Sequence, residues 1–479
     1  MNKSKGNVDN VIGEDVFGVG VGNDFKQMSE CEPAISPAPL QARQGLPTES
    51  FRFCLRQDSI DPWSAGLKHD DLEVDHRSCG FRNVCWFENQ LEFYDGNGTT
   101  TADDIQEMQL SLFPRRNDQG RLQIITTAAS NNSDGGRVLW IDEPAYLSQR
   151  YDQAGLGHLI MESYLPILSL ISSFEGSRAA VHHGNRVIVF KDRCGDGTNP
   201  QLHLESTARR CRRFDQSWIP ILSNYPPVET QPGQRICFRQ LIAGVGALGP
   251  WSSQSVSFSP LNTFQWQHFA EVAHSRFCLR SRLMIPLQTR FSHQAPSWRP
   301  TLTFVGKPAG HERNVVDPRG VTLMLRDWAQ ESNVNFKSLV VGKGVTLRQQ
   351  LDLMSRTQFL VTFGGTTAST LLAFLPAGAL AIIIPQCGIK MPTTARFNEK
   401  IYPYFSQCRQ EEWGFMATTH VSWVRQYMYS VNVWEDGVFT LKGVDIRVDR
   451  LRMFSLLDRA MKDWRQIHRY MSTDHQPVL

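Results

Sequence analysis

The segment LVTFGGTTASTLLAFLPAGALAIIIP, Leu360 to Pro385, decides how the second half of the chain is expected to fold. A short apolar run leads into a Gly/Thr cluster, a helix-like apolar segment, a Pro-Ala-Gly turn and a second apolar run. Short apolar runs bounded by turn residues are typical of strands that are buried on both faces. The Gly/Thr cluster stands where a strand gives way to a helix, so it is either a tight structural turn or a place where an anion is held.

The same alternation of strand and helix extends along the C-terminal half of the chain. The pattern predicts strands over 302–305, 337–341, 359–362 and 379–384, and helices over 320–331, 347–355 and 370–375. Strand and helix in turn indicate βαβ units and a parallel sheet that is covered on both faces. An amphipathic helix is expected over 451–464.

The N-terminal half has a less regular pattern. It predicts strands in 84–94, 121–127, 186–190 and 235–243, and a helix over 159–173 that Pro166 kinks or interrupts. A chain of 479 residues is too long for one ordinary core, so several domains are expected. The expected division is a disordered tail over 1–50, an α/β domain over 51–285, a Pro-rich linker over 286–300, a second domain over 301–446 and a terminal helix within 447–479.

Composition excludes some classes of protein and leaves others open. The chain has 50 basic and 47 acidic residues, a balance that gives no polyanion-binding signature and argues against nucleic acid as a partner. No stretch reaches the ~18 apolar residues of a membrane span, and the first residues lack the apolar core of a signal peptide. With no visible targeting segment, the chain is expected either in the cytosol or in a secretory lumen.

The ten cysteines leave two interpretations open. None of them forms a CxxC pair, so the sequence gives little support to a zinc site. An even number, biased to one half of the chain, favours disulfides in a secretory compartment. A set of buried free thiols fits the number equally well.

The first candidate site is the Gly/Thr cluster after the strand over 359–362. Ligands of a parallel sheet bind at the carboxyl ends of its strands. The backbone N–H groups of Gly364, Gly365, Thr366 and Thr367, with the two hydroxyls, offer donors to a phosphate at a helix start. The cluster is not a Walker loop, because no Gly-Lys-Ser/Thr follows it.

The second candidate site is the basic segment FVGKPAGHERNVVDP, Phe304 to Pro318, which leaves another strand of the same predicted sheet. It carries Lys307, His311 and Arg313 to the same edge. Lysine and arginine can neutralise a departing diphosphate without a metal ion. The alternative is a solvated basic loop.

Two further motifs lie in the N-terminal half. His158 and Glu162 are four residues apart on a predicted helix, where a carboxylate can orient an imidazole and either group can act as a base. The alternative is a helix start with a surface histidine. The run GVGALG, Gly244 to Gly249, matches GxGxxG after a strand, but Pro-Trp-Ser-Ser follows it without a helical pattern, which argues against a dinucleotide site.

The order of several blocks resembles glycosyltransferase family 61, which contains EGF-domain O-GlcNAc transferases and plant xylan arabinosyl- and xylosyltransferases. SCGFRNVCWFENQLEFY resembles the family's early Cys-x-Asn-x-Cys block, and GHLIMESYLPILSLI its His-bearing helix. RICFRQLIAGVG is similar to its CF-containing strand, and TLTFVGKPAGHERNVVDP to its strand that ends in basic residues. The segment that contains FGGTTASTLLAFLPAG resembles its HGAGLTN and F-L-P-x-G block, and VDIRVDRLRMFSLLDRA its terminal helix.

The resemblance implies a GT-B architecture, in which two Rossmann-like domains face each other and the terminal helix returns to the N-terminal, acceptor-side domain. It implies inverting transfer of a sugar from UDP-GlcNAc, UDP-xylose or UDP-arabinose to a hydroxyl of a glycan or glycoprotein in the Golgi or endoplasmic reticulum, with no required metal. Lys307, Arg313 and Asn314 would then contact the nucleotide or its diphosphate, and His158 or Glu162 would be the base.

The sequence departs from the family pattern at its best block. Phe363 or Gly365 stands where the family has histidine, and Lys307 stands where arginine is usual. These departures motivate an alternative, a non-catalytic carbohydrate-binding or scaffold protein on a glycosyltransferase fold. A second alternative is a Rossmann oxidoreductase that uses GVGALG.

Overall fold

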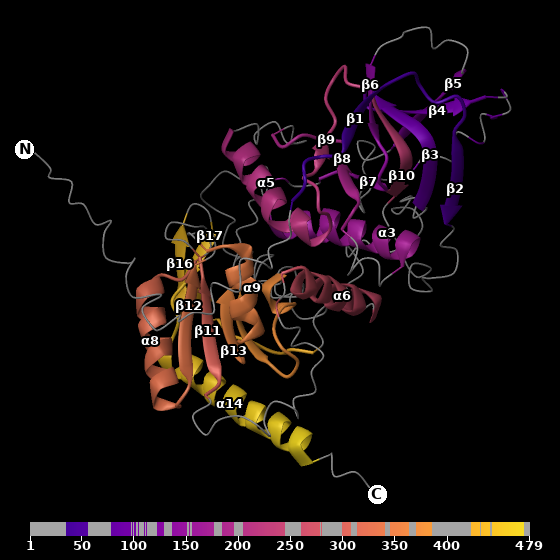
Figure 1. The fold of residues 1–479 in the computed structure, drawn as a ribbon. Coiled ribbons are helices and arrows are strands. Elements are labelled where there is room, and N and C mark those ends of the chain that lie inside the picture. Colours follow the sequence, from indigo (N-terminus) through magenta and orange to yellow (C-terminus); the bar gives the residue numbers. More distant parts are fainter. Residues whose placement is uncertain are drawn as a thin grey trace, which may run out of the picture. The chain divides into compact units, whose positions relative to one another are not determined.

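The structure is a computed structural model, and it describes the following residues: 35–55, 78–96, 98, 100, 101, 104, 110, 112, 122–128, 137–150, 153, 156–176, 184–195, 205–244, 260–277, 279, 299–307, 314–340, 345–363, 370–385, 423–431, 433–440 and 443–473. The chain divides into two compact units. We call residues 33–280 with 419–421 the N-terminal unit, and residues 281–418 and 422–479 with 1–32 the C-terminal unit. Figure 1 shows their elements.

The N-terminal unit is built on one 10-stranded sheet. Its strands are β1 (Leu40–Gln44), β2 (Phe51–Leu55), β3 (Ser78–Phe87), β4 (Gln90–Asp95), β5 (Gln123–Ala128), β6 (Arg137–Ile141), β7 (Ala145–Ser148), β8 (Val187–Phe190), β9 (Val228–Glu229) and β10 (Ile236–Gly244). The main path runs β5-β4-β3-β10-β7-β8-β9, with β1, β2 and β6 as branches. All the strands expected from the sequence of this half are present.

This sheet is mixed, which corrects the expectation of a Rossmann-like N-terminal domain. β3 pairs antiparallel with β2, β4 and β10, whereas β7 pairs parallel with β8 and β10. The β3–β4 hairpin turns at Glu88 and Asn89, which have φ of 49° and 65°. Two consecutive residues with positive φ make the type I′ turn that matches the twist of a hairpin, so the local sequence selects antiparallel pairing here.

The strand β1 corrects the expectation that residues 1–50 are disordered throughout. Leu40–Gln44 pairs antiparallel with β6, although most of its side chains are exposed. Its partner strand, rather than a periodic apolar pattern of its own, keeps this segment extended. An edge strand of this kind leaves little signal in the sequence.

Several helices accompany this sheet in the described part of the N-terminal unit. They are α2 (Leu156–Leu159) with a π-helix (Ile160–Tyr164) and α3 (Leu165–Glu175), then α5 (Glu205–Trp218) and α6 (Pro260–Arg276). Pro166 lies in the first turn of α3, directly after the π-helix, so it marks a boundary within a continuous helical segment. The π-helix was not expected, and it replaces part of the regular helix predicted over 159–173.

Three disulfides lie in the described part of the N-terminal unit, which confirms the disulfide interpretation of the cysteines. Cys54–Cys79 and Cys85–Cys237 join residues that face each other in antiparallel pairs of strands. Cys194–Cys211 joins the segment after β8 to α5. The remaining cysteines lie outside the described residues.

The C-terminal unit contains the parallel sheet expected from the sequence. Its strands are β11 (Thr301–Gly306), β12 (Asn335–Val340), β13 (Phe359–Phe363), β14 (Leu380–Ile384) and β15 (Arg425–Met428). All four neighbouring pairs are parallel, and the strand order is β12-β11-β13-β14-β15. Numbered within this unit the order is 2-1-3-4-5, that of a doubly wound fold.

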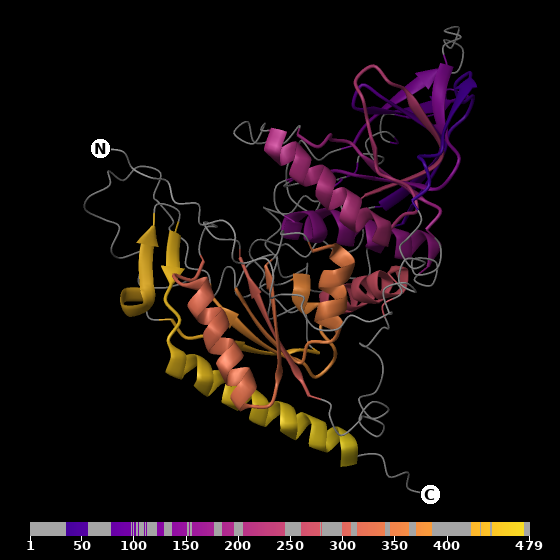
Figure 2. The ribbon, with the colours of Figure 1, turned by 60° about the vertical axis from the view of Figure 1, so that its left-hand side comes forward.

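Helices cover both faces of this sheet, as Figure 2 shows with α8 (Pro318–Glu331) and α14 (Arg450–Thr473) on one face and α9 (Leu347–Ser355) on the other. Thr346 and Gln349 form the capping box that starts α9. Asp317 caps α8 by accepting from the N–H of Gly320, where a Cβ would lie 2.1 Å from the Asp317 carboxylate. A short pair, β16 (Gly437–Thr440) and β17 (Gly443–Ile446), follows α13 (Val433–Asp436).

The position of α14 differs from the expectation that the terminal helix returns to the N-terminal domain. Met453, Leu457 and Trp464 of α14 belong to the core of the C-terminal unit, with residues of α8, β13 and β14. The indole N–H of Trp328 in α8 also donates to Asp458 of α14 at 2.9 Å. The apolar stripe of α14 is therefore buried against its own unit's sheet. Among the described helices, none combines the length and apolarity needed to cross a bilayer.

Candidate functional site

The first candidate region is the point in the C-terminal sheet where the strand order reverses. In the order β12-β11-β13-β14-β15, the chain moves to one side of β11 for β12 and to the other side for β13. The carboxyl ends of β11 and β13 therefore flank a topological switch point, because the connections after them leave in opposite directions. Open α/β sheets bind their ligands in the crevice at this point.

Lys307 and Phe363 lie at this switch point. Lys307 follows β11 directly, Phe363 ends β13, and the Lys307 ammonium lies 5.5 Å from the centre of the Phe363 ring. The ring is almost fully buried, and its face attracts the lysine cation. The structure thus places Lys307 beside Phe363, the residue that precedes the Gly/Thr cluster in the chain.

Most of the other residues predicted for this region lie outside the described part of the chain. These are His311, Arg313, Gly364, Gly365, Thr366 and Thr367. The strand ends that lead into both segments are in place, with Val305 of β11 paired to Thr362 of β13. The sheet therefore brings the starting points of the two loops together, and the roles of the loop residues stay predictions.

Asn314 is described, and it is tied to the backbone around it. Its backbone N–H donates to the Asp445 carboxylate at 2.8 Å, and its side-chain oxygen accepts from the N–H of Val315 at 2.9 Å. Its carbonyl accepts from Ile446 of β17. Asn314 is buried. A nucleotide contact by Asn314 stays a prediction.

The second candidate region is in the N-terminal unit, at the carboxyl ends of the parallel strands β7 and β8. Gln149 and Arg150 follow β7, and Lys191 and Asp192 follow β8. The two strands pair up to Ser148 and Phe190, and the backbone N–H of Lys191 then donates to the carbonyl of Ser148 at 3.0 Å. Four polar residues are thus placed at the edge of parallel strands where α/β proteins bind ligands.

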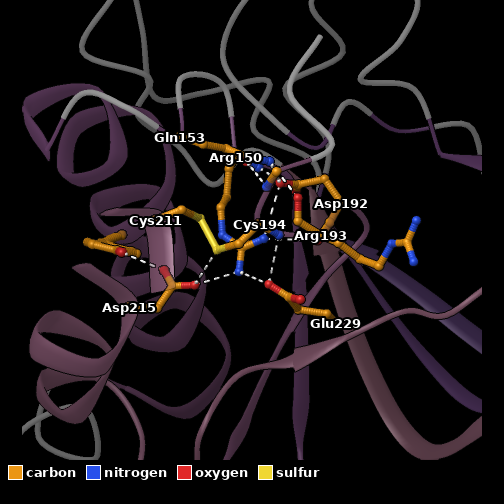
Figure 3. Close-up of a disulfide and its surroundings, with 10 residues drawn as sticks. Arg150, Gln153, Asp192, Arg193, Cys194, Cys211, Asp215 and Glu229 are labelled. Atoms are coloured by element: carbon orange, nitrogen blue, oxygen red, sulfur yellow. Dashed lines mark hydrogen bonds and ion pairs between the residues drawn. A yellow bond between two sulfur atoms is a disulfide. The ribbon is translucent and has the colours of Figure 1, made fainter. Parts of the chain in front are cut away.

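Arg150 is the centre of a buried ion-pair network, and its side chain is fully buried (Figure 3). Its guanidinium donates to the carboxylates of Asp192 at 3.1 Å, Asp215 at 2.5 Å and Glu229 at 3.0 Å, and to the carbonyl of Asp192 at 2.9 Å. It lies 3.8 Å from the centre of the Phe190 ring. We call Arg150 with these three carboxylates the Arg150 centre.

The Arg150 centre brings residues together from four elements and carries more negative than positive charge. Burial alone would lower the pKa of Arg150, but the charges of Asp192 and Asp215 outweigh burial and raise it, so the arginine remains charged. Burial raises the pKa of Asp215, and the Arg150 charge opposes this effect. The Tyr164 hydroxyl donates to Asp215 at 2.7 Å, and burial with this neighbour raises the tyrosine pKa.

The Arg150 centre also fixes the segments that leave β7 and β8. The Gln153 amide donates to Asp192 at 2.7 Å and to the carbonyl of Arg193 at 2.8 Å, and its oxygen accepts from the N–H of Gly195 at 2.7 Å. The N–H of Cys194 donates to Glu229 at 3.0 Å. Both the amide nitrogen and the amide oxygen of Gln153 therefore hold the segment after β7 to the segment after β8.

The Cys194–Cys211 disulfide belongs to the same network. Cys211 and Asp215 are four residues apart on α5, so the disulfide that joins Cys211 to the β8 segment also brings Asp215 to Arg150. In the described part of the chain, Cys194, Cys211 and Asp215 are the one group whose donor atoms lie close enough for a metal ion. Both sulfurs are in the disulfide, so they do not supply the thiolates that a metal site needs.

The helix that carries His158 and Glu162 starts from this region. His158 lies in α2 and Glu162 in the π-helix, and their side chains lie outside what the structure describes. The π-helix departs from the regular helical period on which the pairing of His158 with Glu162 was predicted. Its last residue, Tyr164, contacts Asp215 of the Arg150 centre. Single π turns within helices are frequent at functional sites.

Sequence reasoning missed the Arg150 centre because its members are spread over 80 positions of the chain, from Arg150 to Glu229. Each of them alone is a charged residue of the kind that is normally exposed. One signal was available: QR follows the apolar run AYLS, and KDR follows VIVF. Charged residues directly after two buried parallel strands indicate the ligand edge of a sheet.

Comparison of the chain with known proteins finds a similar solved structure but no matching family. No family model and no curated protein matches the sequence. Among solved structures, the chain is similar to the iron-containing dodecameric glycosyltransferase TibC from enterotoxigenic E. coli H10407. The two chains are 10% identical over 70% of this chain and 79% of TibC, with a TM-score of 0.26. A similarity at this level does not assign a function to the chain.

Proposed function

We propose that the chain is an inverting glycosyltransferase that moves a sugar from a UDP-sugar to a hydroxyl of a glycan or glycoprotein. The observation that carries this proposal is the topological switch point between β11 and β13, with Lys307 held over Phe363. Ligands of doubly wound sheets bind at this point, and a lysine there favours an anion. The resemblance of the sequence blocks supports a nucleotide diphosphate as that anion.

The proposed donor site combines Lys307 with residues of the two loops that start at the switch point. Lys307 and Arg313 would neutralise the diphosphate as the bond between C1 of the sugar and the diphosphate oxygen breaks. The N–H groups and hydroxyls of Gly364 to Thr367 would hold the phosphates. In this scheme the two basic side chains supply the positive charge that a divalent metal supplies elsewhere.

The resemblance of the sequence blocks supports His158 or Glu162 as the base that activates the acceptor. An acceptor hydroxyl attacks C1 of the donor sugar on the face opposite to UDP, and its proton passes to His158 or Glu162. The new glycosidic bond then has inverted configuration at C1. The proposal includes a secretory lumen as the location, and the three disulfides support it, because such bonds persist in oxidising compartments.

Calorimetric titration of the full chain with UDP tests the donor site. We expect Lys307→Met to weaken UDP binding by about tenfold, which corresponds to about 1.4 kcal/mol. Lys337→Met is the matched control, because Lys337 is an exposed lysine on the neighbouring strand β12. Wild-type protein that is folded but binds neither UDP nor a UDP-sugar would contradict the proposal.

Hydrolysis of UDP-GlcNAc, UDP-xylose and UDP-arabinose then tests catalysis and identifies the donor. We expect one of the three to be hydrolysed, and we expect His158→Ala or Glu162→Ala to lower transfer by about a hundredfold or more, the contribution of a general base. Full turnover by both variants would remove these residues from the mechanism. Binding of a UDP-sugar without hydrolysis or transfer would favour a non-catalytic carbohydrate-binding protein.

A further inference from the structure

The disulfides Cys54–Cys79 and Cys85–Cys237 share one position in the sheet and differ in exposure. Each of them joins two residues that face each other in an antiparallel pair of strands. Cys54 is partly exposed, whereas Cys85 and Cys237 are fully buried. Thiol–disulfide exchange requires that a thiolate reach one of the two sulfurs. The Cys54–Cys79 bond is therefore more open to exchange in the folded protein than its buried counterpart.

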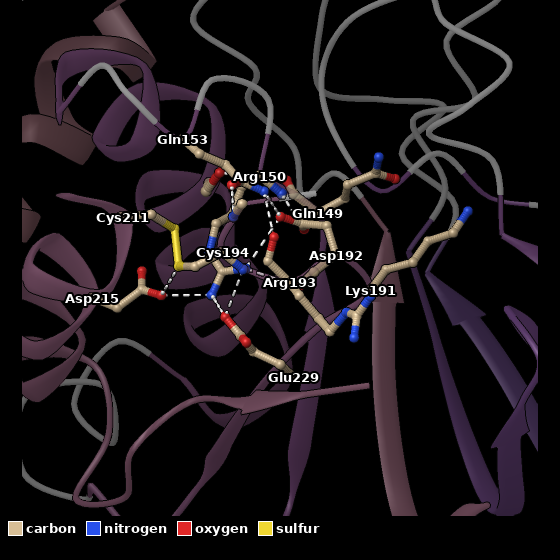
Figure 4. Close-up of polar contacts among 12 residues, drawn as sticks. Gln149, Arg150, Gln153, Lys191, Asp192, Arg193, Cys194, Cys211, Asp215 and Glu229 are labelled. Atoms are coloured by element: carbon tan, nitrogen blue, oxygen red, sulfur yellow. Dashed lines mark hydrogen bonds and ion pairs between the residues drawn. A yellow bond between two sulfur atoms is a disulfide. The ribbon is translucent and has the colours of Figure 1, made fainter. Parts of the chain in front are cut away.

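The third disulfide in the described part of the chain is buried as well. Cys194 is 6% exposed and Cys211 is fully buried. Figure 4 shows their bond beside Asp215, among the polar side chains of the Arg150 centre. Of the three disulfides formed by described residues, Cys54–Cys79 is thus the one with a partly exposed cysteine.

The strand that carries Cys54 lies at an edge of the sheet. Within the described residues, β2 pairs with β3 alone (Figure 1). Phe51 and Phe53 of β2 are 52% and 46% exposed, so the strand buries little of its apolar surface. Segments with few buried apolar contacts open at a low free energy. The position of β2 therefore depends on its cross-link to β3 more than the positions of the central strands depend on theirs.

Phe53 connects β2 to the helix α3. Its partner in the ladder is Gly80 of β3, and a Cβ at Gly80 would lie 2.5 Å from the Phe53 ring, so the ring lies directly over the glycine. The same ring contacts the Phe174 ring of α3, with the two centroids 5.5 Å apart. The strand β2 thus supports the end of α3, which continues directly from the π-helix (Ile160–Tyr164).

We propose that the Cys54–Cys79 bond is a thiol-exchange site whose reduction releases β2 and loosens the end of α3. A thiolate of a dithiol reductant attacks the sulfur of Cys54, the bond to Cys79 breaks, and Cys79 leaves as a thiolate that takes up a proton. The second thiolate of the reductant then attacks the reductant's own sulfur in the mixed disulfide. Cys54 leaves as a thiolate and takes up the second proton. Two electrons pass from the dithiol, which becomes a disulfide, to the cysteine pair.

The release of β2 follows from the loss of the cross-link. The bond spans 25 positions of the chain, and a cross-link of this length restricts the opened state. Its reduction should favour opening of β2 by about a hundredfold. When β2 opens, Phe53 leaves Gly80 and Phe174 together, so the end of α3 loses an aromatic contact. The proposal is independent of the glycosyltransferase function, because neither a sugar nor a nucleotide takes part in it.

Graded reduction of the full chain under native conditions tests the exchange site. Dithiothreitol is the reductant, N-ethylmaleimide traps the free thiols, and peptide mass spectrometry identifies each alkylated cysteine. We expect Cys54 and Cys79 to be alkylated at least about tenfold faster than Cys85 and Cys237, because access limits the rate of exchange. Cys85–Cys237 is the matched control, because it has the same position across an antiparallel pair. Equal rates, or a Cys54–Cys79 bond that resists reduction until the protein unfolds, would overturn the proposal.

Hydrogen exchange of the oxidised and the selectively reduced protein tests the release of β2. We expect peptides of β2 to exchange about a hundredfold faster after reduction. Peptides from the end of α3 should also exchange faster, whereas peptides of β8 should not change and serve as the internal reference. Exchange in β2 or in α3 that does not respond to reduction would overturn the proposal.

Two variants identify the bond and the contact that are responsible. Cys54→Ala/Cys79→Ala lacks the bond, so its β2 should exchange as fast as in the reduced wild type, with or without dithiothreitol. Phe53→Leu keeps the bond but loses the ring contact with Phe174, so the end of α3 should exchange faster without any reductant. Phe51→Leu is the matched control, because Phe51 is a similarly exposed phenylalanine on the same strand. An end of α3 that exchanges equally fast in both phenylalanine variants would overturn the proposed link from β2 to α3.

Discussion

The two units of this chain are both α/β, but different kinds of contact hold them together. In the described part of the N-terminal unit, three disulfides and a buried arginine with three carboxylates join segments far apart in the sequence. In the C-terminal unit, strands of four to six residues pair in parallel, and locally capped helices cover them. The C-terminal unit is therefore specified mainly by local sequence patterns, and the N-terminal unit mainly by contacts between residues far apart in the sequence.

Each kind of organisation suits the role proposed for its unit. The parallel sheet of the C-terminal unit places loops at a switch point without special side chains, because the strand order alone creates the crevice. In the N-terminal unit, the mixed sheet has parallel strand ends at β7 and β8, and there the Arg150 centre fixes the departing segments. Removing individual long-range contacts should therefore affect the N-terminal unit far more than the C-terminal one.

The largest effect is expected from removal of the Cys85–Cys237 disulfide. This bond joins residues 152 positions apart, whereas Cys194–Cys211 joins residues 17 apart. Loop-closure entropy predicts a loss of about 5 kcal/mol for Cys85→Ala/Cys237→Ala and about 3 kcal/mol for Cys194→Ala/Cys211→Ala. Hydrogen exchange with peptide resolution during denaturant unfolding measures both, and peptides of the C-terminal unit serve as the internal reference. An equal loss of unfolding free energy in both units would contradict the expectation that long-range contacts matter mainly in the N-terminal unit.

A loss of about 4 kcal/mol is expected for Arg150→Met. The substitution leaves three carboxylates close together, of which Asp215 is almost fully buried, and an unpaired buried charge costs more than the intact pair contributes. Arg150→Lys keeps the charge without the forked geometry and should lose less. The control is Arg209→Met, whose partner Glu205 is also exposed, with an expected change below about 0.5 kcal/mol. An Arg150→Met variant as stable as the control would show that the Arg150 centre does not stabilise the fold.

The difference between the units also explains how much of the fold could be predicted. In the C-terminal unit, the apolar runs over 359–363 and 380–384 lie in strands, and the helix predicted over 347–355 has the same bounds in the structure. Local signals, such as the Thr346–Gln349 capping box, were sufficient there. In the N-terminal unit, the sequence predicted β3, β4, β5, β8 and β10 but not the other five strands. The pairing of the strands was not predicted, because the partner of each strand is not encoded by its own periodicity. The strand β1 is an example, since it depends on β6.

The candidate sites could be predicted to different extents for the same reason. Lys307 was predicted from its place after a strand, and the strand order then put it at the switch point beside Phe363. The Arg150 centre depends on the folding of β7, β8, α5 and β9 against one another, and a single sequence shows no link between Arg150 and Asp215.

A smaller loss, of about 3 kcal/mol, is expected from Leu457→Ala, and it tests where the terminal helix belongs. Leu457 of α14 is fully buried in the core of the C-terminal unit, whereas Leu451 of the same helix is 79% exposed. Truncating a buried leucine removes apolar contact and leaves a cavity, and truncating an exposed one changes little. Leu451→Ala is therefore the matched control. The loss should appear as faster hydrogen exchange in β13 and β14, which share the core with Leu457. Faster exchange in peptides of the N-terminal sheet instead would show that α14 stabilises the other unit, as the sequence resemblance implied. The terminal helix would then be a long-range contact of the N-terminal unit and not part of the C-terminal core.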